Sequence, residues 1–72
     1  MDLKVVGDRI KLCRKANNLT QPELAEKLGM TRENISGYEN GRITPTSTSI
    51  FFLSKLFNVS SDFLLGLKDT KE

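Results

Sequence analysis

The chain has 72 residues, of which 38% are hydrophobic and 28% charged, a composition typical of one ordinary globular domain rather than of a disordered segment. A net charge of +2 points only weakly toward nucleic acid, and no apolar run approaches the roughly 18 residues that a membrane span needs. The absence of histidine excludes the usual metal clusters and histidine-based catalytic arrangements, so we expect neither an enzyme nor a cofactor, and no small-molecule substrate is evident.

The first predicted helix covers residues 3–16, where Val6, Ile10 and Cys13 recur at i, i+4 and i+7 and form a core stripe. Cys13 is the single cysteine and cannot form an internal disulfide, so we interpret it as a core thiol. The charged residues of this segment are Lys4, Arg9, Lys11, Arg14 and Lys15, against Asp2 and Asp8. This basic bias fits either a solvated helix face or a supporting role near phosphates.

The segment TQPELAEKLGMTRENISGYENGR, residues 20–42, predicts a short helix, a tight turn and a second helix. Thr20 and Glu23 have the S/T-x-x-E spacing of a capping box, which begins a helix over residues 21–28. Gly29 follows where a helix C-terminus favours the left-handed conformation, so the chain should turn sharply there.

Thr31 is the N-cap candidate of the next helix, over residues 32–40, which buries Ile35 and Tyr38. The side of this helix that faces away from those two residues is polar and mixed in charge. Its members are Arg32, Glu33, Asn34, Ser36, Gly37 and Asn40. A helix with this exposed face is suited to contact another molecule.

A fourth helix should begin near residues 46–48, after Pro45, and end at Asn58, which tolerates the left-handed region. Its expected core residues include Ile50, Leu53 and Phe57. Ser60 is placed to cap a short fifth helix. Five short helices with brief connections make a compact all-α bundle.

In order and in register, LTQPELAEKLGMTRENISGYENGR resembles the helix-turn-helix of the lambda-repressor and Cro-like DNA-binding domains, the Xre group. The likeness extends to the start of the fourth helix at Pro45-Thr46, the apolar segment 50–57 and the ending NVSSDFLLG. It implies a five-helix DNA-binding domain over residues 1–67, with the helix-turn-helix at 20–42. Residues 68–72 are expected to form a flexible C-terminal tail.

The resemblance implies that the helix over residues 32–40 enters the major groove of DNA, with its first residues near the base edges. Arg32 is suited to donate two hydrogen bonds to guanine, or else forms a loose surface ion pair. Glu33 either accepts from cytosine or favours the helix N-terminus through its charge. Ser36 and Gly37 occupy positions where the family contacts bases, although Gly37 also fits a tolerated surface site.

The resemblance and the helix ends together predict five phosphate-binding residues: Gln21, Thr31, Asn34, Asn40 and Arg42. Gln21 lies in the first turn of its helix, where free N–H groups and the dipole attract an anion. Asn34 either contacts a phosphate or helps to cap its own helix. The two residues after Arg42 replace more basic residues of the family, which predicts a weak contact of this loop with the backbone.

Three apolar residues, Phe52, Leu56 and Phe63, occupy places where a lone domain usually carries polar side chains. We interpret them as a homodimer contact, with the alternative that they extend the small core around Phe57 and Leu64. A twofold dimer reads two half-sites whose centres lie about one helical turn apart.

The resemblance therefore implies a transcriptional regulator that binds double-stranded DNA, most simply a repressor that recognises an inverted-repeat operator as a homodimer. It also implies a bacterial or phage-encoded protein that works in the cytoplasm, at the nucleoid. The competing hypothesis is a protein-interaction module, an antitoxin or adaptor, which keeps the scaffold and uses its apolar fourth helix to hold a protein.

Overall fold

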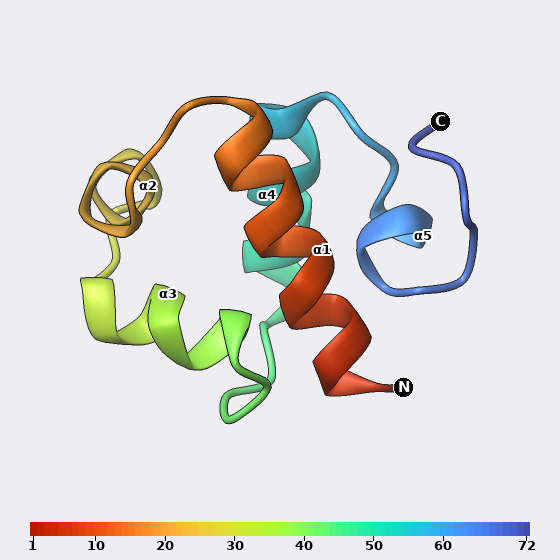
Figure 1. Cartoon of the computed structure of the whole chain (residues 1–72), viewed down its shortest axis with the longest axis horizontal. Coiled ribbons are helices and arrows are strands. Elements are labelled where there is room, and N and C mark those ends of the chain that lie inside the picture. The colour runs from red at the N-terminus through yellow and green to blue at the C-terminus, as the bar shows by residue number, and fades with distance from the viewer.

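The computed structural model describes all 72 residues, and they fold into five helices and no strand. The helices are α1 (Leu3–Ala16), α2 (Gln21–Leu28), α3 (Arg32–Glu39), α4 (Ser47–Phe57) and α5 (Ser61–Leu64). In Figure 1, α1 runs through the middle of the molecule in front of α4, with α2 and α3 on one side and α5 on the other. This arrangement confirms the predicted all-α bundle. None of the helices combines the length and the apolar character that crossing a bilayer requires.

Local hydrogen bonds begin and end the helices largely where the sequence predicts. The capping box of α2 is formed, because Thr20 Oγ1 accepts from the Glu23 amide at 3.2 Å and Glu23 Oε1 accepts from the Thr20 amide at 2.8 Å. Gly29 and Asn58 end α2 and α4 with φ of 66° and 55°. α3 ends at Glu39, one residue before the predicted end, and Asn40 is its C-cap.

The core is a single cluster to which every helix contributes. Its fully or nearly buried side chains are Val6, Ile10, Cys13, Leu24, Ala25, Ile35, Tyr38, Ile50, Leu53, Phe57, Phe63 and Leu64. The predicted stripe of α1 is confirmed, and burial raises the pKa of the Cys13 thiol, an effect that Lys71 opposes. A buried thiol of this kind acts as a small hydrophobic side chain.

Phe63 belongs to this core, and its prediction as a dimer contact is wrong. Only 5% of the residue is exposed, and the Arg9 guanidinium lies 4.5 Å from the centre of its ring. The reason is the direction of α5, which turns Phe63 inward against α1, so that the alternative of an extended core holds for this residue. Phe52 and Leu56 remain exposed.

Residues 68–72, which we expected to form a flexible tail, are bonded to the rest of the chain. Arg9 Nη1 donates to the carbonyl of Lys68, and the Ser60 amide donates to the carbonyl of Lys71 at 2.7 Å. Asp69 also lies 3.4 Å from Arg9 Nη2. The segment therefore folds back onto α1 and the start of α5.

Gly7 lets α1 approach the end of α3 more closely than any other residue would allow. A Cβ atom at this position would lie 2.4 Å from the carbonyl oxygen of Tyr38 and 2.6 Å from that of Glu39. Backbone atoms cannot move aside as a flexible side chain can. The orientation of α3 on the bundle therefore depends on a missing side chain in α1.

We predict that Gly7→Ala lowers the free energy of unfolding by about 1 to 3 kcal/mol, because the added methyl group has no room against two carbonyl oxygens. At an unhindered helix position, the same change raises stability by roughly 1 kcal/mol. Urea unfolding followed by circular dichroism measures the difference. Asp8→Ala, at the exposed neighbouring position, is the control and should stay within about 0.5 kcal/mol of the original protein. A more stable Gly7→Ala protein would contradict the close packing.

Candidate nucleic-acid interface

The helix-turn-helix presents one side of α3 outward. Leu24 and Ala25 of α2 and Ile35 and Tyr38 of α3 are buried, which fixes the two helices against the core. The turn between them is tightened by the Met30 amide, which donates to the carbonyl of Ala25 at 2.8 Å. The opposite side of α3 is left for contact with another molecule.

The first turn of α3 carries two exposed, oppositely charged side chains, Arg32 and Glu33. Neither takes part in an ion pair, so the loose pair considered for Arg32 does not form, and Glu39 is bonded to Arg14 instead. Ser36 lies one turn further on and is half-buried. Arg32 and Glu33 therefore stay available to an external partner.

Gly37 is not free to approach DNA, so its prediction as a base-reading residue is wrong. It is buried, and a Cβ atom there would lie 2.3 Å from Cδ1 and 2.6 Å from Cγ1 of Ile43. The amides of Arg42 and Ile43 both donate to the Gly37 carbonyl, at 3.0 and 3.1 Å. The glycine does mark a close approach, but its neighbour is the loop that follows α3.

Few backbone donors remain at the start of α2, where we expected a phosphate. The Thr20 and Glu23 amides are bonded within the capping box, and Pro22 has no N–H, which leaves the Gln21 amide. Backbone and side-chain hydrogen bonds with Thr20 lower the pKa of the Glu23 carboxyl, so it stays charged beside this site. Gln21 Nε2 donates to Glu39 Oε1 at 3.2 Å and has a second N–H.

The other predicted phosphate contacts lie at the two ends of α3. Thr31 and Asn34 bond to each other, because Thr31 Oγ1 accepts from the Asn34 amide at 3.2 Å and donates to Asn34 Oδ1. This pair supports the alternative in which Asn34 helps to cap its own helix. At the other end, Asn40 Oδ1 accepts from the amide and from Nε of Arg42, at 3.1 and 2.9 Å. The amide groups of both asparagines still have donors for a further partner.

A buried ion pair that the sequence pattern did not predict holds α3 to α1. Arg14 donates from Nε to Glu39 Oε2 at 2.6 Å, from Nη2 to Glu39 Oε1 at 3.0 Å and from Nη1 to the carbonyl of Leu19 at 2.7 Å. Both side chains are over 90% buried. The spacing offers a signal, since Arg14 stands four residues after Ile10 and seven after Gly7, on the inner side of the helix. Arg14 is thus no part of a basic outer face.

We predict that Glu39→Gln lowers the free energy of unfolding by about 3 to 5 kcal/mol, because it leaves the Arg14 charge buried without a counter-charge. Chemical denaturation measures the loss. Glu33→Gln makes the same chemical change at an exposed position of the same helix, and it should cost less than about 0.5 kcal/mol. Equal effects of the two changes would mean that the pair does not hold α3 in place.

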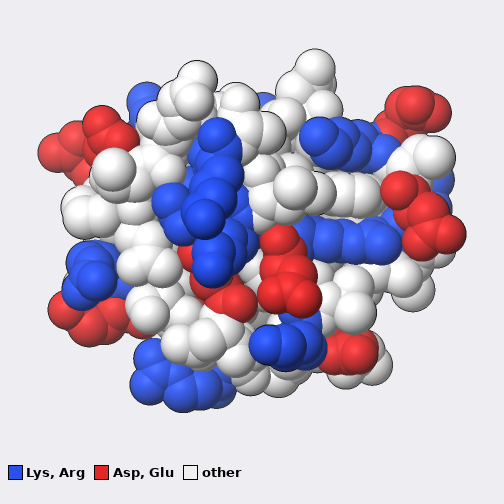
Figure 2. Space-filling model, viewed as in Figure 1, with Lys and Arg blue, Asp and Glu red and all other residues white.

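The surface charge is mixed rather than uniformly basic. In Figure 2, Lys and Arg side chains gather in the middle of the visible face, and Asp and Glu side chains lie between and around them. Two of the basic residues of α1, Arg9 and Arg14, are committed to partners within the chain. Lys4, Lys11 and Lys15 are exposed, and they are what remains of the predicted basic bias.

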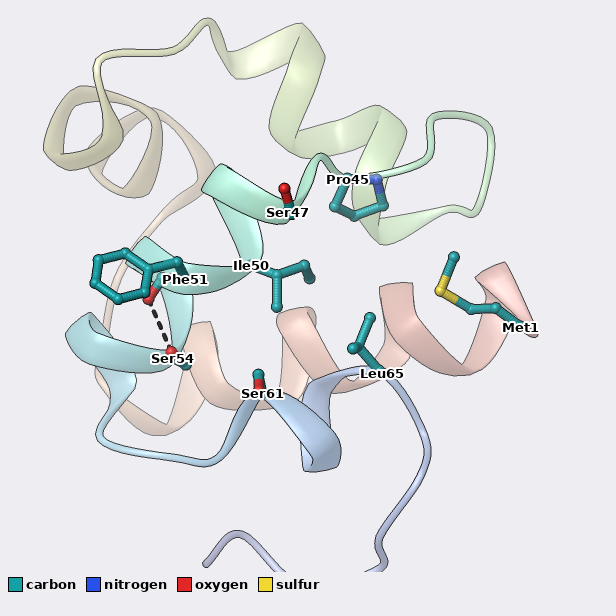
Figure 3. Close-up of a pocket in the computed structure, with 8 residues that line it drawn as sticks. All are labelled: Met1, Pro45, Ser47, Ile50, Phe51, Ser54, Ser61 and Leu65. Atoms are coloured by element: carbon teal, nitrogen blue, oxygen red, sulfur yellow. Dashed lines mark hydrogen bonds between the residues drawn. The ribbon is translucent and has the colours of Figure 1, made fainter.

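A second exposed feature lies on α4, away from its buried side. Phe51, Phe52 and Leu56, which we call the α4 patch, are 53%, 53% and 37% exposed, and the two phenylalanine rings meet edge to face at 5.4 Å. A groove of about 500 Å³ adjoins Phe51. Figure 3 shows its lining: Met1, Pro45, Ser47, Ile50, Phe51, Ser54, Ser61 and Leu65. The chain thus exposes an apolar surface distinct from the outer side of α3.

Residues 10–64 match the helix-turn-helix family. The HTH-type transcriptional regulator ImmR of Bacillus subtilis (strain 168) is 43% identical over 61 residues, which are 85% of this chain and 48% of that protein. The antitoxin PezA of Streptococcus pneumoniae serotype 4 is 37% identical over 62 residues, 86% of this chain and 39% of PezA. The solution structure of the DNA-binding domain of the P22 C2 repressor has a TM-score of 0.79 and 30% identity, and the match covers 97% of this chain and 95% of that one.

The chain therefore belongs to the helix-turn-helix family, in its lambda-repressor-like, Xre-type branch, as the resemblance implied. Its relatives include helix-turn-helix transcriptional regulators, and its structural neighbours include the DNA-binding domain of a repressor. The chain spans about half the length of the first curated relatives that it matches.

Proposed function

We propose that this domain binds duplex DNA in a sequence-specific manner, with α3 in the major groove, and serves a transcriptional repressor. The observation that carries the proposal is the pair of exposed side chains Arg32 and Glu33, which form no ion pair within the chain. They lie in the first turn of a helix whose other side is fixed by Gly7 and the Arg14–Glu39 pair. A major groove about 12 Å wide admits such a helix, and its N-terminal residues then lie near the base edges. Occupation of a promoter by the domain would block polymerase.

Base discrimination is assigned to three side chains. Arg32 donates two hydrogen bonds to O6 and N7 of guanine, and Glu33 accepts from the amino group of cytosine. Ser36, half-buried one turn further on, is the third and is able both to donate and to accept. Because Arg32 and Glu33 are adjacent and oppositely charged, they favour a DNA site in which guanine and cytosine are adjacent bases on the strand that α3 contacts.

We assign the contacts that position the domain on the DNA backbone to residues around the two ends of α3. Gln21 and its amide, together with Thr31 and Asn34, bind one stretch of the phosphate backbone, and Asn40 with Arg42 binds another. Since Gln21 also bonds to Glu39, a phosphate held there is connected to α3 itself. The modest number of free basic side chains favours a low affinity for one half-site.

A gel shift against genomic fragments over a series of salt concentrations tests the proposal. Regulator function requires sequence preference and an affinity that falls steeply as salt rises, because bound phosphates release counterions. If the domain is instead a protein-interaction module, no fragment shifts even at low salt. The similarity to an antitoxin is the observation that favours this second candidate.

We predict that Arg32→Ala loses about 1 to 3 kcal/mol of binding free energy on the selected operator and clearly less on random duplexes. The reason is that a contact to a base edge depends on sequence, whereas a phosphate contact does not. Fluorescence anisotropy titrations at one fixed salt concentration measure both losses. Lys27→Ala, an exposed basic residue on α2, is the control and should weaken both duplexes alike or neither. Equal losses for Arg32→Ala would assign Arg32 to the phosphate backbone.

We further propose that the domain works as a homodimer on an inverted repeat, with the α4 patch as the contact between copies. The patch exposes two phenylalanine rings, and the adjoining groove of about 500 Å³ has the volume to receive a side chain of the second copy. A standard interface takes roughly 800 Å² from each partner, a modest share of the 4417 Å² surface of this chain. Pairing also compensates for a weak half-site.

We predict that Phe52→Glu weakens dimerisation and operator binding together, because a charge replaces an apolar ring in the proposed contact. Sedimentation equilibrium measures the mass, and a gel shift with the full inverted repeat measures binding. Leu12→Glu is a matched control on α1, since Leu12 is 52% exposed and Phe52 is 53% exposed. An unchanged sedimentation mass for Phe52→Glu, beside a dimeric original protein, would reject this interface.

We propose that the protein is a bacterial or phage-encoded regulator and that it acts in the cytoplasm, at the nucleoid. The relatives from Bacillus subtilis support this assignment. We also propose that the domain acts by binding alone, without catalysis or a cofactor.

A further inference from the structure

The outer side of α3 is completed by a residue that does not belong to the helix. Gly37 stands four residues after Glu33, so the two share the outward side of α3, and a side chain at position 37 would point the same way. That space is filled by Ile43, whose Cδ1 and Cγ1 lie 2.3 and 2.6 Å from where a Cβ of residue 37 would be. Ile43 thus replaces a helical side chain in the second turn of α3.

The backbone holds Ile43 in this place. Its own amide and that of Arg42 both donate to the Gly37 carbonyl, and the side chain of Arg42 is bonded to Asn40. Ile43 is nevertheless 38% exposed, so part of the aliphatic side chain remains open to solvent. A fixed, partly exposed isoleucine on this side of α3 presents an apolar surface to whatever α3 contacts.

The chemistry of this surface selects one feature of DNA. An aliphatic side chain has no donor for a phosphate and no hydrogen bond to offer a base edge. The C5-methyl group of thymine is the apolar group that a base pair displays in the major groove. We propose that Ile43 is a specificity-determining residue that contacts a thymine methyl group when α3 is in the groove, an inference that rests on the proposed function.

Substitution of uracil for thymine tests the contact, because it removes the methyl group and leaves every hydrogen-bonding group of the base in place. An operator recovered from a random duplex library is resynthesised with single uracil replacements at each thymine of one half-site. The original protein should lose about fourfold in affinity at one of these positions, the amount expected for one buried methyl group. Ile43→Ala should bind the thymine operator about as weakly as the original protein binds the uracil one, and it should not distinguish the two.

Two further variants separate this contact from a general effect on the loop. Ile43→Val removes Cδ1 and keeps a γ-carbon against Gly37, so it should fold normally and show a reduced preference for thymine. Thr44→Ala alters an exposed residue next in the chain and should keep the full preference. Circular dichroism melting confirms that each protein is folded before its affinity is measured.

The outcomes distinguish the two levels of the proposal. Specific binding in which every uracil replacement affects the original protein and Ile43→Ala equally would overturn the role of Ile43 and leave the proposed function intact. Failure to bind any duplex at low salt would overturn both. Loss of the thymine preference in Ile43→Ala, with normal preference in Thr44→Ala, is the result that supports the contact.

Discussion

A carboxylate and a guanidinium that face each other inside the bundle hold α3 in its place on α1. Arg14 and Glu39 join the middle of the molecule to the last turn of α3, and Gln21 extends the connection to the first turn of α2. Such a pair contributes little net stability compared with apolar residues of the same shape, but either partner alone would be very unfavourable. The contribution of the pair is therefore geometric, because the observed placement of α3 satisfies both charges.

The packing of α1 against α3 reinforces this placement from a second direction. Gly7 allows the carbonyl groups at the end of α3 to lie against the α1 backbone, where a methyl group would not fit. Hydrogen-bonding geometry and steric fit thus agree on the orientation of α3, and Arg32 and Glu33 in its first turn form no ion pair within the chain. A helix that is rigidly placed and unpaired on its outer side loses little conformational entropy when it binds. This combination is what a DNA-binding helix needs.

The helices, their caps and most of the core could be predicted because they depend on residues close together in the sequence. The capping box needs only Thr20 and Glu23, and the stripe of α1 needs only the helical period. The errors involve partners that are distant or belong to another element. Phe63 is buried by the direction of α5, and Gly37 is covered by a loop residue six positions away. The spacing of Arg14 indicates the inner side of α1, but its partner Glu39 is 25 residues away and cannot be predicted from that spacing.

The hydrogen bonds of Arg9 fix the course of the last residues as well as the position of α5. By holding the carbonyls of Phe63 and Lys68, this side chain directs the chain terminus along α1, on the side of the bundle remote from α3 (Figure 1). A fluorescent label or a fused domain joined after Glu72 would therefore project away from α3. Attachment at the carboxyl end thus suits immobilisation and imaging, since the helix-turn-helix stays unobstructed.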